Sequence, residues 1–219
     1  MEAIKEIYAL GVGCNTPVFI DIAEACGYKV IGMYHYNEDK TEKTEYGIKI
    51  LGSFSDLYKR NDLSKCNFIL TMGDNKIRSS VFNTLQSLGA NIPTLIHPFS
   101  QISRFASIDS QGVIISPFSY IQANSTINAN TIILSHVNIS HNTKIGKHCF
   151  FAGNSTVGAY TKVEDFVFWG QGALSISSKV PIVGTHAYIG ARSVITRNVP
   201  AFSTVCGSPA KVIKKGDRI

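Results

Sequence analysis

The chain has 219 residues, of which 44% are hydrophobic and 16% are charged, and its formal net charge at pH 7 is +6. This length and hydrophobic content suffice for one large domain or two small ones with a buried core, and they exclude a disordered chain. The low share of charged residues favours a β-rich fold over a helical bundle. The Lys and Arg residues are scattered along the sequence, so we expect no nucleic-acid partner.

The cysteines and the N-terminal stretch indicate the cellular compartment. Residues 1–13 contain two acidic residues and too short an apolar run for a signal peptide, and no stretch reaches the roughly 18 apolar residues that span a bilayer. We therefore expect a cytoplasmic protein without a membrane partner. The five cysteines lie far apart and form no CxxC pair, so we expect reduced, mostly buried thiols rather than disulfides or a zinc ribbon: Cys14, Cys26, Cys66, Cys149 and Cys206.

Residues 1–98 alternate short apolar runs with helical patterns. Strands and helices in alternation are typical of a small parallel α/β sheet, here Rossmann-like. The pattern predicts strand, helix, strand, strand, helix and strand in IKEIYALGVG (4–13), PVFIDIAEACG (17–27), YKVIGMY (28–34), CNFILTMGD (66–74), IRSSVFNTLQSLG (77–89) and IPTLIHP (92–98).

The first predicted strand enters the first predicted helix through the turn GVGCNT (11–16). Gly11 and Gly13 would let backbone amides approach a phosphate at the helix N-terminus, which Asn15 would cap. The turn lacks the third glycine of the dinucleotide fingerprint, so a merely tight turn remains an alternative.

From about residue 100 an apolar residue returns every sixth position. Two positions before each of them stands a small or β-branched residue, from Ser119 to Val167. A six-residue period fits neither a helix nor a hairpin; it indicates a parallel β-helix in which three hexapeptides form one coil. We expect the periodic apolar residues to point inward, and small residues, Asn or Gly to form the corners. The inward series is Ile121, Ile127, Ile133, Ile139, Ile145, Phe151, Val157, Val163 and Trp169.

The six-residue register slips once, between Trp169 and Val183, and then resumes with Ile189 and Ile195. We expect a loop or a widened coil at SISSKVP (175–181). Residues 102–213 would supply roughly six coils. The flat faces of such a prism pack best in closed cyclic symmetry.

Three of the six histidines fall in SHVNISHNTKIGKH (135–148). The H-x4-H spacing of His136 and His141 resembles two zinc ligands of the γ-class carbonic anhydrases. A third ligand is expected six hexapeptides before His136, where this chain has Ser100, so we expect no metal. His148 occupies the same column of the repeat as His136 and is expected on the surface.

The chain resembles the left-handed β-helix acyltransferases, and within them the NeuD/PglD-like sialic-acid O-acetyltransferases and nucleotide-sugar N-acetyltransferases. The resemblance covers nearly the whole chain. It implies a Rossmann-like nucleotide-sugar-binding domain at 1–98 and a left-handed β-helix acyltransferase domain at 99–219. It also implies a homotrimer with acetyl-CoA between neighbouring subunits. The motifs that carry it are GVGCNTPVFIDIAEACGYKVIG (11–32), TMGDNKIR (71–78), IHP (96–98), the hexapeptides, SHNTKIG (140–146) and GSPAKVI (207–213).

The resemblance also implies site residues. His141 would be the general base that takes a proton from a sugar amine or hydroxyl. Asn142 follows it, where the family often has Asp or Glu; its amide oxygen could still orient the imidazole. Gly11, Gly13, Gly73 and Asp74 match the nucleotide-sugar pocket, together with Asn15 in the phosphate turn.

Acetyl-CoA would contact the β-helix. The resemblance implies that the Ala159 amide stabilises the oxyanion and that Gly170, Gly190 and Ala191 let the pantetheine arm lie close to the coil. Phe150 stands where the family can carry a second histidine near the thioester.

The implied activity is transfer of an acetyl group from acetyl-CoA to an amino or hydroxyl group of a sugar, foremost a nucleotide-linked amino sugar, for polysaccharide or glycan synthesis. Direct transfer in a ternary complex is favoured, because Cys149 has no basic partner in its repeat and is a poor acyl acceptor. Two alternatives stay open. One is a metalloenzyme like the γ-carbonic anhydrases, and the other is a β-helix sugar-binding protein whose catalysis has decayed.

Overall fold

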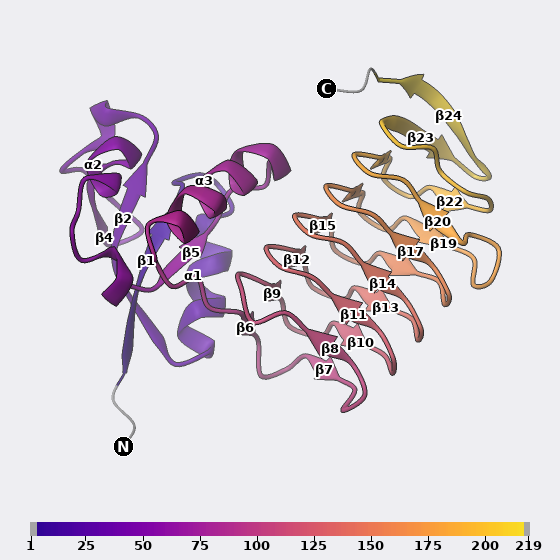
Figure 1. The fold of residues 1–219 in the computed structure, drawn as a ribbon, viewed down its shortest axis with the longest axis horizontal. Coiled ribbons are helices and arrows are strands. Elements are labelled where there is room, and N and C mark those ends of the chain that lie inside the picture. The colour runs from indigo at the N-terminus through magenta and orange to yellow at the C-terminus, as the bar shows by residue number, and fades with distance from the viewer. Residues whose placement is uncertain (1–3, 217–219) are drawn as a thin grey trace. The chain divides into compact units, whose positions relative to one another are not determined.

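A computed structural model of the chain describes residues 4–216. It divides into two compact units, Met1–Pro98 and Phe99–Ile219 (Figure 1). None of the helices in the described part is long and apolar enough to cross a membrane.

The first unit is built on a five-stranded sheet in the order β3-β4-β2-β1-β5. Strands β4, β2, β1 and β5 run parallel, and β3 pairs with β4 in the antiparallel sense. The elements are β1 (Lys5–Leu10), α1 (Thr16–Ala25), β2 (Tyr28–His35), the 3-10 helix η1 (Glu38–Lys40), β3 (Thr44–Glu45), β4 (Ile48–Ser53), α2 (Phe54–Tyr58), the 3-10 helix η2 (Leu63–Lys65), β5 (Phe68–Leu70), α3 (Asn75–Ser87) and β6 (Leu95–Ile96).

All six predicted elements are present, but the last strand, β6, is not part of the five-stranded sheet in which it was expected. Their apolar periods explain the core: α1 buries Phe19, Ile22 and Ala23 on one helical face, and the three residues of β5 are all buried. The β3–β4 hairpin and α2 were not predicted. The hairpin follows a strongly charged stretch, residues 38–45, and the short apolar run of β4, with Ile48, Ile50 and Leu51, was not assigned as a strand.

The second unit is a stack of three-sided coils (Figure 1). On each face the successive strands run parallel and pair in register, as in Ile121↔Ile139↔Val157. The first face contains β7 (Gln101–Ile102), β10 (Tyr120–Ile121), β13 (Asn138–Ile139), β16 (Thr156–Val157), β19 (Leu174–Ser175) and β22 (Val194–Ile195). The second contains β8 (Ser107–Ile108), β11 (Thr126–Ile127), β14 (Lys144–Ile145), β17 (Lys162–Val163) and β20 (Ile182–Val183).

The third face carries longer strands at its C-terminal end, where β23 and β24 form an antiparallel hairpin. Its strands in the second unit are β9 (Ile114–Ile115), β12 (Ile132–Ile133), β15 (Phe150–Phe151), β18 (Phe168–Trp169), β21 (Tyr188–Ile189), β23 (Ser203–Gly207) and β24 (Ala210–Lys215).

The two predicted columns of the repeat form the core of the β-helix. Every residue of the apolar series from Ile121 to Trp169 is 0% or 1% exposed, and so is every residue of the small series from Ser119 to Val167. The inward prediction is confirmed. The largest of these side chains, Trp169, stacks on Phe151 with ring centroids 5.7 Å apart and donates its indole N–H to the Ala173 carbonyl at 3.1 Å.

A third column of the repeat contains residues with positive φ at the corners. It was expected to hold small residues, Asn or Gly, but it also contains bulky ones, among them Phe118, His136, His148 and Tyr160. A left-handed conformation costs about 1–2 kcal/mol for such residues. Rings in successive coils stack on one another and offset part of this cost, as with Phe118 and His136 at 5.1 Å.

One of these ring columns corrects the placement of His148. Its imidazole lies 4.8 Å from the Phe166 ring, and its Nδ1 is 2.8 Å from the Asn130 amide nitrogen. The side chain is only 7% exposed, so His148 is a buried corner residue and not a surface residue. The stack continues from Phe166 through His186 to Phe202.

The predicted irregularity near residues 175–181 is a widened coil. Lys162 pairs with Ile182, twenty positions later, whereas Thr126 pairs with Lys144, eighteen positions later. Ser177 and Ser178 keep the regular register with Ala159 and Tyr160, so the two additional residues lie between Ser178 and Ile182.

The cysteines are free thiols, as expected, but their burial was predicted wrongly. Only Cys149 is buried; Cys14 is exposed and the other three are intermediate. Cys149 is buried because it belongs to the small column of the β-helix. Cys14 lies in the turn between β1 and α1, where the chain is at the surface.

Candidate functional site

The first unit contains a cavity of 260 Å³ where β1, β2 and β5 end. The carboxyl ends of neighbouring parallel strands meet at one edge of a sheet, which is the usual ligand-binding edge of this architecture. The cavity is lined by Gly11, Val12, Gly13, Cys14, Asn15, Thr16, His35, Tyr36, Phe54, Thr71, Met72, Gly73 and Ile77.

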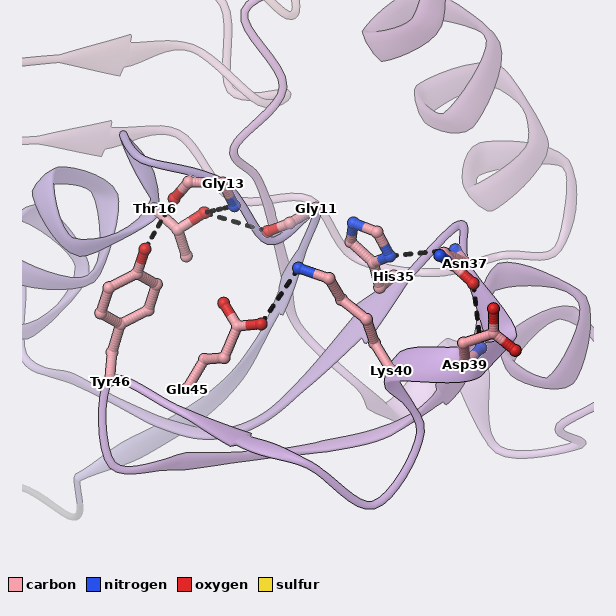
Figure 2. A network of polar contacts seen from close by, with 9 residues as sticks. All are labelled: Gly11, Gly13, Thr16, His35, Asn37, Asp39, Lys40, Glu45 and Tyr46. Carbon is pink, nitrogen blue, oxygen red and sulfur yellow. Dashed lines mark hydrogen bonds and ion pairs between the residues drawn. The ribbon is translucent and has the colours of Figure 1, made fainter.

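Position 11 requires glycine, both for its backbone conformation and for a close contact with a neighbouring side chain. Its φ is +92°, and a Cβ atom there would lie 2.8 Å from the Met72 sulfur. The turn that follows is held by Thr16, whose hydroxyl oxygen accepts from the Gly13 N–H at 2.9 Å (Figure 2). Asn15 makes no side-chain cap to α1, contrary to expectation, because the Thr16 hydroxyl already occupies the turn.

The β5–α3 turn forms the opposite wall of the cavity. Gly73 lines it, as predicted, whereas Asp74 is not among its lining residues. The Asp74 carboxylate caps α3 by accepting from the amides of Lys76 and Ile77, each at 2.9 Å. The fully buried Arg78 donates to the Met72 carbonyl at 3.0 Å and so stabilises the same turn.

His35, at the end of β2, lines the cavity. Its Nδ1 accepts from the Asn37 N–H at 2.9 Å (Figure 2). This bond requires the neutral ring with its proton on Nε2. Burial lowers the pKa of His35, and the nearby Lys40 ammonium acts in the same direction.

The sequence analysis assigned no role to His35 or Tyr36 and missed most of the cavity lining. Exposed apolar and aromatic side chains edge the cavity, with Tyr36 76% and Ile77 55% exposed. Tyr46 also donates its hydroxyl proton to the Gly13 carbonyl at 3.1 Å (Figure 2). Tyr46 belongs to the β3–β4 hairpin, which was not predicted.

In the second unit, His141 lies at the corner between the first and second faces, which we call the His141 corner. This corner comprises the stacked positions Ala123, His141, Ala159 and Ser177 with the positive-φ residues that follow them. The imidazole is exposed and packs edge-on against Tyr160 of the next coil, with centroids 5.2 Å apart. Gln122 accepts from the His141 backbone N–H at 3.2 Å and holds the loop from the coil below.

Asn142 contacts the imidazole directly, with its Nδ2 3.0 Å from His141 Nδ1. An amide NH2 can only donate, so this orientation puts the ring proton on Nε2. A half-turn of the amide would bring Oδ1 to Nδ1–H and leave Nε2 as the proton acceptor. Asn142 thus controls which nitrogen of His141 is basic.

The predicted acetyl-CoA contacts lie at three different places on the prism. Ala159 is at the His141 corner, and its N–H donates to the Ser177 hydroxyl at 3.0 Å. Phe150 lies on the third face, where its ring stacks on Phe168 at 5.4 Å. Gly170, Gly190 and Ala191 lie at the corner between the third and first faces, which we call the Gly172 corner: Phe118, His136, Asn154, Gly172 and Arg192, with adjoining residues.

The glycines of the Gly172 corner are required by the stacking itself. A Cβ atom at Gly170 would lie 2.5 Å from the Ile189 carbonyl oxygen, and one at Gly190 would lie 2.8 Å from Cys206 Cβ. A hollow of 290 Å³ opens at this corner beside Ala191, Gly172 and Arg192.

The H-x4-H pair is split between two corners. His136 stacks at the Gly172 corner and His141 lies at the His141 corner, at the two ends of β13. Among residues 4–216, no group of three or more His, Cys, Asp or Glu side chains is placed to hold a metal ion.

Comparison with known proteins finds relatives over both units. Residues 6–85 match the PglD N-terminal domain. The GDP-perosamine N-acetyltransferase of Escherichia coli O157:H7 is 34% identical over 152 residues, which are 68% of this chain and 68% of that protein.

Two solved structures share the fold. A histidine-to-asparagine variant of perosamine N-acetyltransferase from Caulobacter crescentus, in complex with CoA and GDP-perosamine, superimposes with a TM-score of 0.88 at 26% identity, over 98% of this chain and 99% of that one. The acetyltransferase domain of PglB from Neisseria gonorrhoeae FA1090 gives 0.86 at 23% identity, over 95% and 100% of the two chains.

The identity to the Escherichia coli protein and the match of the N-terminal domain agree with the fold and with the motifs found in the sequence. The chain therefore belongs to the NeuD/PglD-like family of sugar acetyltransferases, which combine a Rossmann-like domain with a left-handed β-helix.

Proposed function

We propose that the protein transfers the acetyl group of acetyl-CoA to the amino group of a nucleotide-linked amino sugar, with His141 as general base. The observation that carries the proposal is the exposed imidazole of His141 at a β-helix corner, held by Asn142 and Tyr160 and followed one coil later by the Ala159 amide. The perosamine N-acetyltransferase in complex with CoA and GDP-perosamine supports the choice of both substrates.

The nucleotide part of the substrate fits the cavity of the first unit. The glycine turn leads into the start of α1, where the helix dipole favours an anion. The Gly11 and Gly13 amides themselves donate to Tyr34 and Thr16 and so shape the turn. Tyr36, Phe54 and Ile77 offer apolar surface for a base. Gly11, Gly13, Asn15, Gly73 and Asp74 remain the proposed nucleotide-sugar residues, with Asp74 acting through the α3 cap rather than by lining the cavity.

The reaction needs one proton acceptor and one oxyanion donor. Once the Asn142 oxygen accepts from His141 Nδ1–H, Nε2 is free to take the proton of the attacking amine. The thioester oxygen gains negative charge as the tetrahedral intermediate forms, and a preorganised donor at the same corner stabilises it. Both groups come from stacked coils, so their spacing is set by the β-helix.

We also propose a homotrimer. Ala159 and the group formed by Gly170, Gly190 and Ala191 belong to different corners of one prism. One extended acetyl-CoA can contact both sets if the His141 corner of one copy faces the Gly172 corner of the next. Closed threefold packing of flat faces provides this arrangement. Phe150, on the third face, stays a predicted contact.

The assembly can be tested by complementation. His141→Ala and Ala191→Trp would each inactivate the enzyme, the first by removing the base and the second by filling the opposite wall. Co-expressed chains should regain part of the activity, because some interfaces combine an intact His141 corner with an intact Gly172 corner. A monomer in light scattering, or no complementation, would contradict the trimer.

The activity is tested by release of free CoA from acetyl-CoA with UDP-, dTDP- and GDP-linked amino sugars and their hydroxyl counterparts. We expect turnover with an amino sugar, and a loss of about 10²- to 10⁴-fold in kcat for His141→Ala. His186→Asn is the matched control, because it replaces a β-helix histidine at a corner outside the proposed site and keeps a residue that tolerates positive φ. Full activity of His141→Ala would disprove the proposed base.

The same assay separates the two alternatives. A sugar-binding protein with decayed catalysis would bind a nucleotide sugar and leave acetyl-CoA intact with every acceptor. A metalloenzyme of the γ-carbonic-anhydrase kind would contain stoichiometric metal in elemental analysis and lose its activity to a chelator.

A further inference from the structure

Ser177 lies in the turn that stacks on Ala159 at the His141 corner, eighteen residues later in the chain and just before the widened part of its coil. A Cβ atom at Gly158 would lie 2.6 Å from both the Ser175 carbonyl oxygen and the Ser177 amide nitrogen. The turn therefore rests directly on the backbone of Gly158, and only glycine at 158 allows this approach. The Gly158 N–H itself donates to the Ser175 hydroxyl at 2.8 Å.

The Ser177 hydroxyl covers the amide of Ala159. That N–H lies outside the ladder of backbone bonds between coils and donates instead to Ser177 Oγ at 3.0 Å. Ala159 is 3% exposed, whereas Ser177 is exposed. A ligand that approaches this corner from solvent meets the hydroxyl before it meets the amide.

We infer that the Ser177 hydroxyl is the group that donates a hydrogen bond to the thioester oxygen of acetyl-CoA, an inference that rests on the proposed function. The hydroxyl oxygen accepts from Ala159 N–H, and its own proton stays available for donation. A donor that already accepts a hydrogen bond is polarised and donates more strongly. The amide thus acts through Ser177 rather than on the substrate itself.

The position of Ser177 suits the reaction. His141, Ala159 and Ser177 occupy the same position in three successive coils, about 4.8 Å apart per coil. Base and donor are therefore on one corner, and the serine side chain points down toward the coil between them, where its hydroxyl meets the Ala159 amide.

The chemical step balances with these groups. The amine nitrogen attacks the thioester carbon and forms the C–N bond, while the carbonyl π pair moves to oxygen and is stabilised by the Ser177 O–H. The pair then returns, the C–S bond breaks, and CoA leaves as a thiolate. His141 takes the proton from nitrogen and passes it to the thiolate.

A binding experiment tests the contact without turnover. S-acetonyl-CoA has a carbonyl where S-propyl-CoA has a methylene, and neither can transfer an acyl group. We expect the wild-type protein to bind the acetonyl analogue up to about tenfold more tightly in calorimetry, the scale of one net hydrogen bond. Ser177→Ala should lose this preference and Ser177→Thr should keep it. Ser178→Gly, in the same turn and at a positive-φ position, is the control and should keep it too.

Kinetics give the second readout. Ser177→Ala should lower kcat by about 10²- to 10³-fold with little change in the KM of acetyl-CoA, because the bond strengthens as the oxyanion forms. An unchanged kcat in Ser177→Ala would overturn the inference. It would also be overturned if the wild-type protein bound the two analogues equally or bound neither of them. Failure of the proposed function would appear differently, as an analogue preference without turnover on any sugar.

Discussion

The two units bring functional residues together in different ways. In the first unit the cavity is lined by Gly11, His35 and Gly73, which are far apart in sequence and meet because parallel strands end at one edge. In the second unit His141, Ala159 and Ser177 meet because they are one coil apart. In a β-helix, the place of a residue in the repeat fixes its burial, its backbone conformation and its neighbours. In the α/β unit the burial, conformation and neighbours of a residue depend instead on the loops that connect strands and helices.

The largest effect is expected from the inward column. Trp169→Ala should lower the free energy of unfolding by about 3–5 kcal/mol, because it empties a fully buried position and removes the donor to Ala173. Tyr188→Ala, an outward and half-exposed position one coil later, should cost less than about 1.5 kcal/mol. Denaturant unfolding measures both. Equal losses of stability in the two variants would refute the claim that the place of a residue in the repeat decides its burial.

The second prediction concerns the turn that connects β1 to α1 in the first unit. Gly11→Ala should destabilise by about 1–2 kcal/mol from positive φ alone, and the contact with Met72 adds to this. Gly13→Ala is the matched control, since nothing lies within 4 Å of its would-be Cβ. Calorimetry with UDP, dTDP and GDP should show weaker binding for Gly11→Ala. If both variants bind as wild type, the cavity is not the nucleotide site.

A third prediction concerns Asn142. Asn142→Asp keeps a residue that tolerates positive φ and places a carboxylate beside the imidazole. The carboxylate accepts Nδ1–H, fixes the tautomer needed for a base and favours the protonated ring. The acid limb of the pH–rate profile should therefore move to higher pH by about one unit. An unchanged profile would mean that residue 142 does not act on the base.

The smallest effect is the pH dependence of the first unit. Burial holds the pKa of His35 below its ordinary value of 6.5, so the unfolded chain binds this proton at a higher pH than the folded one. The stability of the unit should therefore fall as the pH is lowered below about 6.5 and hold above it. Thermal unfolding between pH 7.5 and 5.5 measures this. His35→Gln should flatten the slope, and the same slope in that variant would assign it to another group.

The sequence predicted the architecture of both units because each has a strong period. The inward series of the β-helix, its small column and the widened coil near residue 177 were all visible in the spacing of apolar residues. The corner column was misjudged, because the stacking of rings such as Phe166 and His186 depends on residues 18 or 20 positions apart. This stacking allows bulky residues at corners where Asn or Gly would usually be preferred.

The candidate site was predicted less completely. Gly11, Gly13, Asn15 and Gly73 line the cavity, but Asp74 caps α3 and Thr16, not Asn15, holds the turn. Tyr46 comes from the β3–β4 hairpin, whose short apolar run at residues 48–51 was not assigned as a strand. The bond between Ala159 and Ser177 joins two residues eighteen positions apart, and the orientation of the Ser177 side chain that forms it is not encoded in any local pattern.

The most direct test of the account is a crystal structure with S-acetonyl-CoA and a nucleotide-linked amino sugar. The account predicts the analogue's carbonyl oxygen about 2.7–3.1 Å from a donor of the His141 corner and the sugar nitrogen within reach of His141. A carbonyl oxygen without a donor from the His141 corner, or an imidazole turned away from both ligands, would contradict it.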